Sequence, residues 1–207
     1  MDEARLSPGI LFVSAAVFPL AKTGGLARIM LPGYSQALDL ARDLNTVDSP
    51  EGRLLTDRMP DSDVPVILFD APALFRRSGG LYQDAGGQEW PDNDHRFAAL
   101  NRAVALVALG GTTLGWRPEI VHANDWHTGT LPALLHYSGQ PRPKTVFTIH
   151  NLAFQGNFPL TAFPYLGLPT EVLSPDGIEF YKQISFIKAG IRYSDQPTND
   201  GQSDLRA

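Results

Sequence analysis

The segment Ile120-Val121-His122-Ala123-Asn124-Asp125-Trp126-His127 joins a short apolar run to the start of a helical pattern. Ile120–His122 is typical of a buried strand, and the apolar residues of His127–Tyr137 have helical spacing. Parallel strands need a crossover connection, usually a helix, so a strand that leads into a helix is typical of a parallel sheet. We therefore expect this segment to belong to a parallel α/β sheet.

The same alternation extends in both directions along the chain. Apolar, β-rich runs predict further strands at Ile10–Val13, Val64–Phe69 and Lys144–Ile149. Asp92, Asn93 or Asp94 can cap a helix that ends at Gly110-Gly111. The apolar positions of this helix lie three or four residues apart, at Phe97, Leu100, Val104 and Val107. Strands that alternate with helices predict the α/β fold class, with a Rossmann-like parallel sheet.

The composition narrows the function classes. The chain has 207 residues, with 17 Lys and Arg against 22 Asp and Glu, a formal net charge of -5 and no cysteine. This charge gives no basic footprint for nucleic acid, and the lack of cysteine excludes disulfide scaffolds and cysteine–zinc sites. The first apolar run, Ile10–Leu20, is short, follows Asp2 and Glu3, and contains Pro19, which makes it a poor signal peptide or membrane span. We expect a cytoplasmic protein that binds neither nucleic acid nor membrane.

Polar residues that could bind a ligand follow two of the expected strands. The segment Lys22-Thr23-Gly24-Gly25-Leu26 follows the first apolar run, and His150-Asn151 follows the strand at Lys144–Ile149. In an open α/β sheet, ligands bind outside the carboxyl ends of the strands. Without Cβ atoms, Gly24 and Gly25 allow backbone N–H groups to approach an anion, and Lys22 adds a positive charge.

Three further candidates each have a structural alternative. Asp125 is either an N-cap of the following helix or a ligand-binding group. His150 is either a hydrogen-bond donor to a sugar hydroxyl or a structural histidine, and the adjacent Asn151 favours the first reading because a carbohydrate needs several donors and acceptors. Tyr82, in a loop rich in glycine, supplies either a stacking ring and a hydroxyl or a cover for the core.

Several motifs together resemble the amino-terminal domain of bacterial glycogen synthase and plant starch synthase, from about Ile10 to Asp195. They occur in the same order as in that family, at 22–27, 31–34, 70–72, 122–127, 150–156 and 177–190. The resemblance implies the amino-terminal half of a glycosyltransferase with two Rossmann-like domains (GT-B). It also implies retaining transfer of glucose from ADP-glucose to the non-reducing end of an α-1,4-glucan such as glycogen, without a metal or other cofactor.

The resemblance also implies roles for individual residues. Lys22 resembles the lysine that contacts the ADP-glucose phosphates, and Gly24 and Gly25 resemble the loop that lies against the diphosphate. His150 and Asn151 resemble the pair beside the donor glucose, with His150 near the reacting centre. Asp125, which we group with His150 as catalytic, and Tyr82 match positions on the sugar and acceptor side of the cleft.

The chain departs from the family near its start. The family follows the Lys-Thr-Gly-Gly-Leu-Ala motif with an acidic residue and a helix of several turns, whereas here Ala27 runs directly into Arg28–Tyr34. A connector that contains Pro19, Gly24 and Gly25 is unsuited to form a crossover helix. We expect that the first crossover helix is deleted and that one face of the first strands is uncovered.

The carboxyl end differs too. We expect a domain at residues 1–195 and a polar, disordered, aberrant tail at 196–207, in place of the second domain that supplies most of the family's nucleotide pocket. This change of character suggests the hypothesis of a frameshift or early stop, and such a truncated chain is expected to be inactive alone. Two alternatives remain, a non-catalytic module that binds glucan or a partner, and a decayed remnant that folds incompletely.

Overall fold

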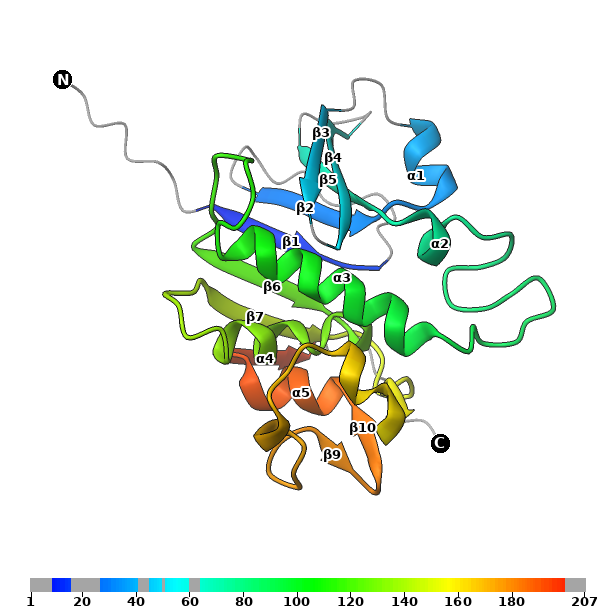
Figure 1. Ribbon diagram of the computed structural model, residues 1–207, viewed down its shortest axis with the longest axis vertical. Coiled ribbons are helices and arrows are strands. Elements are labelled where there is room, and N and C mark those ends of the chain that lie inside the picture. Colours follow the sequence, from blue (N-terminus) through cyan, green and yellow to red (C-terminus); the bar gives the residue numbers. More distant parts are fainter. Residues whose placement is uncertain (1–8, 16–26, 41–44, 50, 60–63, 200–207) are drawn as a thin grey trace.

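The computed structural model describes residues 9–15, 27–40, 45–49, 51–59 and 64–199. Its main feature is an eight-stranded sheet with the order β11-β7-β6-β1-β2-β5-β4-β3 (Figure 1). The strands are β1 (Ile10–Val13), β2 (Ala27–Pro32), β3 (Asn45–Ser49), β4 (Gly52–Arg58), β5 (Pro65–Asp70), β6 (Ile120–Asn124), β7 (Lys144–Ile149) and β11 (Gln196–Asn199). Pairing is parallel from β11 to β5 and antiparallel from β5 through β4 to β3. The expected α/β fold with a mostly parallel sheet is confirmed.

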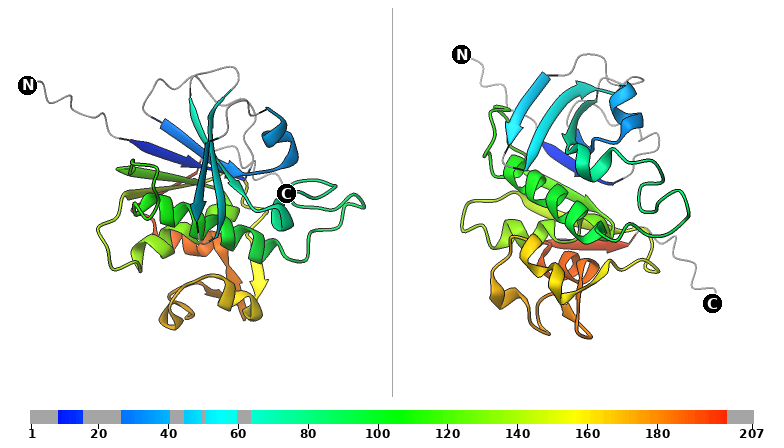
Figure 2. Two further views of the ribbon diagram at one scale, coloured as in Figure 1. Left: turned by 45° about the horizontal axis from the view of Figure 1, so that its top comes forward. Right: turned by 45° about the vertical axis from the view of Figure 1, so that its right-hand side comes forward.

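One face of this sheet is covered by three helices. These are α3 (Asn93–Ala108), α4 (Leu131–His136) and α5 (Phe186–Tyr193), which lie on the same side of the strands (Figures 1 and 2). The four apolar positions expected on the long helix, Phe97, Leu100, Val104 and Val107, are all fully buried. They share one core with residues of β1, β6 and β7. Burial of an apolar stripe against the sheet thus accounts for the position of α3.

A second, smaller core lies on β2, β4 and β5. It contains Ile29, Leu31, Leu55, Val64, Val66 and Leu68, with Ala37 and Leu38 of α1 (Ser35–Leu40) packed against it. Because successive side chains of a strand point to opposite faces, Met30 and Ile67 belong to the first core instead. The strands β2 and β5 are therefore apolar on both faces, as expected for parallel strands.

The expected deletion of a crossover helix falls on the connection between β1 and β2. Residues 16–26 of this connection lie outside the described part of the chain, so the deletion stays a prediction. Ala27 begins β2, which pairs in parallel with β1 from Ile10 opposite Ala27 to Val13 opposite Met30.

The segment after Asp195 differs from the expectation of disorder. Residues Gln196–Asn199 form β11, which pairs in parallel with β7. The Asp195 carboxylate accepts hydrogen bonds from Thr145 N at 2.8 Å and Arg142 Nη1 at 2.7 Å, which brings the chain to the edge of β7. Backbone pairing at a sheet edge does not require apolar side chains and tolerates proline. The domain therefore extends at least to residue 199, and residues 200–207 lie outside the described part.

The remaining elements surround α5 and the ends of the strands. A three-stranded antiparallel sheet, β8 (Asn157–Pro159), β10 (Gln183–Ser185) and β9 (Glu179–Phe180), lies at the end of the molecule away from β3 and β4 (Figure 1). Short helices occupy Pro72–Phe75 (α2), Trp126–Thr128, Leu160–Tyr165 and Thr170–Val172. No helix in the described ranges is both long and apolar enough to cross a membrane.

Candidate functional site

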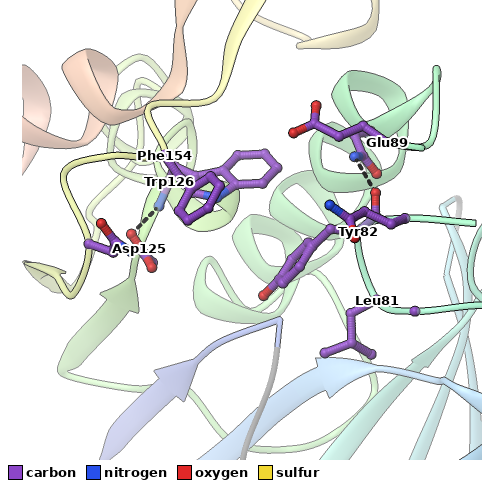
Figure 3. A pocket seen from close by; sticks show the side chains of 10 residues that line it. Leu81, Tyr82, Glu89, Asp125, Trp126 and Phe154 are labelled. Atoms are coloured by element: carbon purple, nitrogen blue, oxygen red, sulfur yellow. Dashed lines mark hydrogen bonds between the residues drawn. The ribbon is translucent and has the colours of Figure 1, made fainter. Parts of the chain in front are cut away.

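A pocket of about 330 Å³ lies where the chain leaves β6 and β7. One wall is the glycine-rich segment between α2 and α3, and the other consists of the residues that follow the two strands. Figure 3 shows Tyr82 on one wall and Trp126 and Phe154 on the other. The lining residues are Gly80, Leu81, Tyr82, Gln83, Glu89, Asn93, Asp125, Trp126, Asn151 and Phe154. The pocket thus occupies the edge of the sheet at which ligands bind in open α/β folds.

Asp125 is the N-cap residue of the following turn and also lines the pocket, while its role as a ligand-binding group stays a prediction. Its carboxylate accepts a hydrogen bond from Trp126 N at 3.1 Å, as an N-cap does, and the residue also lines the pocket. Its backbone has φ 65° and ψ 174°, a conformation that non-glycine residues rarely adopt. Hydrogen bonds from Asp125 N to Thr148 O and from Thr128 N to Asp125 O hold the residue in this conformation. Strained backbone of this kind is common at ligand sites.

Tyr82 likewise both covers the core and faces the pocket. Its ring centroid lies 5.9 Å from that of Phe97, 5.9 Å from that of Trp126 and 5.8 Å from that of His127. Burial, together with the nearby negative charge of Asp125, raises the pKa of Tyr82 to about 12. The phenol is therefore protonated at neutral pH, and its hydroxyl can donate as well as accept a hydrogen bond.

The histidine after β7 is oriented by a neighbouring strand. His150 Nε2 lies 2.9 Å from Asn124 Oδ1, and Asn124 Nδ2 donates in turn to Val13 O and His122 O. The nitrogen of the Asn124 amide donates to these two carbonyls, so its oxygen is the atom that faces His150. Because this oxygen can only accept, His150 Nε2 carries the proton. In the neutral ring, Nδ1 is then an acceptor. His150 itself is not among the lining residues of the pocket, although the adjacent Asn151 is.

Asn151 is exposed, and its position is set by its own loop. Its Oδ1 accepts a hydrogen bond from Ala153 N at 2.9 Å, which closes a turn, and the residue lines the pocket. The structure therefore brings Tyr82, Asp125 and Asn151 to one pocket. Lys22, Gly24 and Gly25 lie outside the described residues, and their roles stay predictions.

Sequence reasoning did not assign roles to several other residues at the pocket. Trp126 and Phe154 lie within motifs that were recognised, but aromatic residues next to strand ends are as often part of the core. Beneath Tyr82 lies His127, which is 4% exposed and whose two ring nitrogens have no hydrogen-bond partner among the described residues. Burial, with a smaller contribution from His150, lowers the pKa of His127 to about 3, so its ring is neutral. No sequence signal distinguishes it from an exposed histidine.

The charge and polarity of the pocket favour a neutral polyhydroxylated ligand. Its described lining has two carboxylates, Glu89 and Asp125, and three amides, Gln83, Asn93 and Asn151, but no lysine or arginine. These groups can pair with hydroxyls, while the rings of Tyr82, Trp126 and Phe154 can cover apolar faces. An anionic ligand group needs a cation from elsewhere. Within the described ranges, no group of three histidine or acidic side chains could hold a metal ion.

The chain matches the family model described as starch synthase catalytic domain over residues 9–199. It is 47% identical to the glycogen synthase of Burkholderia thailandensis and 46% identical to that of Paramagnetospirillum magneticum, over 91% of this chain in both cases. These alignments cover 40% and 44% of the relatives, so the chain spans less than half the length of these curated proteins.

A solved structure agrees in fold. The catalytic domain of starch synthase IV from Arabidopsis thaliana, bound to ADP and acarbose, aligns with 92% of this chain and 44% of its own, with a TM-score of 0.73 and 22% sequence identity. The similarity in structure therefore extends over nearly all of the chain, and it agrees with the order of motifs in the sequence. This chain belongs to the starch synthase catalytic domain family.

Proposed function

We propose that this chain forms the amino-terminal part of a glycogen synthase that transfers glucose from ADP-glucose to the non-reducing end of an α-1,4-glucan. In a retaining transfer, the bond from the glucose C1 to the diphosphate breaks, and a bond from C1 to a glucan hydroxyl forms on the same face of the sugar. The observation that carries the proposal is the pocket that unites Tyr82, Asp125 and Asn151. The identity of 47% to a glycogen synthase supports it.

Two separate sets of residues are expected to bind the sugar and the diphosphate parts of the ligands. The glucose and glucan hydroxyls are expected to bind at the described pocket, through Asp125 and Asn151, with Tyr82 against a sugar ring. His150 is expected to lie beside the reacting centre, oriented by Asn124. The diphosphate is expected to bind Lys22 and the backbone of Gly24 and Gly25, where the lysine charge stabilises the departing ADP. This division fits the lack of a cation in the described lining of the pocket.

We further propose that the 207-residue chain alone binds its ligands but transfers glucose poorly. A transfer site between two domains needs groups from both, and this chain spans 40% of the length of its Burkholderia relative. Transfer is therefore expected when the chain is supplied as part of a protein of full family length.

Thermal unfolding with added ligand tests the proposal, because a ligand that binds only the folded state raises the midpoint. Maltotetraose should raise the midpoint of the unmodified chain but not that of Asn151→Ala. ADP-glucose should raise it in the unmodified chain but not in Lys22→Ala. The matched controls are Asn157→Ala and Lys182→Ala, which remove an exposed amide and an exposed amine away from the pocket. If neither ligand shifts the midpoint of the unmodified chain, the proposal is wrong.

The second candidate is a glucan-binding module that uses no nucleotide. The aromatic walls and the lack of a cation in the described pocket lining favour it. A midpoint that rises with maltotetraose and stays constant with ADP-glucose selects this alternative. A third reading, a remnant that folds incompletely, predicts no cooperative transition with or without ligand.

A further inference from the structure

The glycine-rich wall of the pocket is attached to α3 through a buried arginine. We call residues 78–91 the Tyr82 loop. Arg96 on α3 is 1% exposed and lies beneath this loop. Its Nε donates to Leu74 O at 2.7 Å, and its Nη1 donates to Leu81 O at 3.0 Å and to Asn93 Oδ1 at 2.7 Å. The guanidinium therefore joins the segment before the loop, the loop itself and the start of α3.

This arrangement is an unusual use of a charged side chain. Buried arginines are ordinarily paired with a carboxylate, because an unpaired buried charge is costly. Arg96 forms no ion pair within the described part of the chain, and burial lowers its pKa. The cation lies instead 5.3 Å from the ring centroid of Phe75 and 5.4 Å from that of Phe97. An apolar side chain could fill this volume. The groups that accept hydrogen bonds from Arg96 therefore indicate what its guanidinium does.

Those acceptors lead to Tyr82. While Arg96 donates to Asn93 Oδ1, Asn93 Nδ2 donates to Tyr82 O at 3.0 Å. Tyr82 O also accepts from Trp90 N at 3.0 Å. The peptide groups on both sides of Tyr82 are thus held, directly or through Asn93, by one guanidinium. The ring of Tyr82, whose centroid lies 5.9 Å from that of Trp126, is carried by that backbone.

The rest of the Tyr82 loop contains no helix or strand and is held by turns. Its internal contacts are two isolated bridges, Gly79 with Asp84 and Gln83 with Glu89, and hydrogen bonds such as that from Trp90 Nε1 to Gly80 O at 3.2 Å. Four of its residues are glycines, which increase the conformational freedom that must be lost when the loop is ordered. A second arginine, Arg77, donates from both Nη atoms to Asp92 and closes the base of the loop. Arg77 fixes where the loop begins and ends, whereas Arg96 and Asn93 hold its backbone at Leu81 and Tyr82.

We propose that Arg96 is a positioning residue for the pocket, which acts through the backbone of Leu81 and through Asn93 to hold Tyr82 opposite Trp126. The effect of Arg96 on the order of the loop does not depend on a ligand, whereas its effect on the affinity for a ligand rests on the proposed function. Loss of the guanidinium fork is expected to release the Tyr82 loop and leave the main core folded.

Hydrogen exchange measures the release directly. Amides of the loop that donate hydrogen bonds, Gly80 N, Asp84 N and Trp90 N, report on its order. Arg96→Lys keeps the charge, but one ammonium does not reproduce a fork that reaches Leu74 O and Leu81 O on separate segments. We expect these amides to exchange about tenfold faster or more, because hydrogen bonds to charged groups contribute at the upper end of the usual range. Amides of β6 and β7 should keep their rates.

The matched control is Arg102→Lys on the same helix. Arg102 pairs with Glu51 and donates to the carbonyl of Tyr165, and it has no described contact with the Tyr82 loop. This control should leave exchange in the loop unchanged. Asn93→Ala provides a second test, because it removes the side chain that links Arg96 to Tyr82 O without altering the buried charge. This variant should also accelerate hydrogen exchange at Trp90 N. Unchanged exchange in the loop of both Arg96→Lys and Asn93→Ala overturns the proposal, as does equal acceleration throughout the core.

Binding separates this proposal from the proposed function. If the unmodified chain binds maltotetraose, Arg96→Lys should weaken the affinity about tenfold while the core remains protected, because the loop must then be ordered on binding. An affinity equal to that of the unmodified chain contradicts the positioning role. A lack of binding by the unmodified chain contradicts the proposed function instead, and the exchange rates alone then decide the role of Arg96.

Discussion

Acidification should destabilise the chain through the buried histidine beneath the pocket. His127 is neutral in the folded state, where burial lowers its pKa from 6.5 to about 3. In the unfolded state the pKa returns to about 6.5. Between these values the unfolded chain binds a proton that the folded chain does not, so protons favour unfolding. The stabilising effect of a neutral His127 is complete above the unfolded pKa and decreases as the pH falls toward the folded pKa.

The two pKa values set the size of this effect. Linkage gives a loss of about 2 kcal/mol in the free energy of unfolding between about pH 7.5 and about pH 5. For a chain of this length, that loss corresponds to a decrease of about 4 to 8 °C in the unfolding midpoint. Burial also lowers the pKa of His122, which acts in the same direction, so the comparison must isolate His127.

A variant without the histidine at position 127 separates the effect of His127 from that of His122. His127→Phe keeps a ring among Tyr82, Phe97 and Trp126 and removes a group whose nitrogens have no described partner. Denaturant unfolding at several pH values should show that about 2 kcal/mol of the pH-dependent loss is absent from His127→Phe. Any loss of stability caused by the larger phenylalanine ring is the same at every pH. It therefore does not alter the difference in pH dependence between His127→Phe and the unmodified chain.

The control is His136→Gln, which removes an exposed histidine from the end of α4 and should retain the full contribution of His127. The range above about pH 5 also keeps the carboxylates ionised. If His127→Phe and the unmodified chain lose equal stability between the two pH values, the reasoning from burial is refuted.

Three further predictions concern other parts of the chain. In Gly129→Ala the new Cβ would lie 2.0 Å from Phe186 O, so we expect a loss of about 3 kcal/mol or more in denaturant unfolding. Asp195→Asn weakens the contacts with Arg142 and Thr145, and should cost about 1 to 2 kcal/mol and accelerate hydrogen exchange in β11. Asn124→Ala releases His150 and should weaken maltotetraose binding about tenfold, measured by calorimetry.

The parts of the fold that the sequence predicted are those in which burial imposes a pattern. The strands β1, β5, β6 and β7 are apolar runs, and α3 has an apolar stripe, so each was located to within a few residues. The strands β3 and β11 are polar and lie at the two edges of the sheet. β11 pairs with β7, which is distant in sequence, and this pairing requires Asp195 to be fixed first, so no local pattern indicates it. β3 pairs with the adjacent β4 in a hairpin, but its polar residues form no apolar run.

The candidate site was predictable for a different reason. Parallel strands bring their carboxyl ends to one edge, so Asp125 and Asn151 could be expected together from the order of strands alone. Tyr82 could not be placed in this way, because its loop follows no parallel strand directly and its position depends on Arg96. In an isolated sequence, an arginine within a helical pattern predicts a solvated position, which is the opposite of what the structure shows.

Three departures from ordinary protein structure meet at this pocket. Asp125 has a positive φ, Arg96 is a buried cation that forms no ion pair with the described residues, and His127 is a buried ring without a described hydrogen-bond partner. Positive φ alone is a weak signal, because Tyr181 and Lys182 adopt it in the tight turn between β9 and β10. The three departures at the pocket differ in kind, and each destabilises the fold by itself.

All three residues lie close to the contacting rings of Tyr82 and Trp126. Asp125 caps the turn that begins with Trp126, His127 lies under Tyr82, and Arg96 holds the backbone that carries Tyr82. A sequence selected for stability alone has no reason to concentrate such groups in one place, whereas a binding site does. The pocket lined by Tyr82 and Trp126 is therefore supported as a functional site by the physical chemistry of this chain, independently of its relatives.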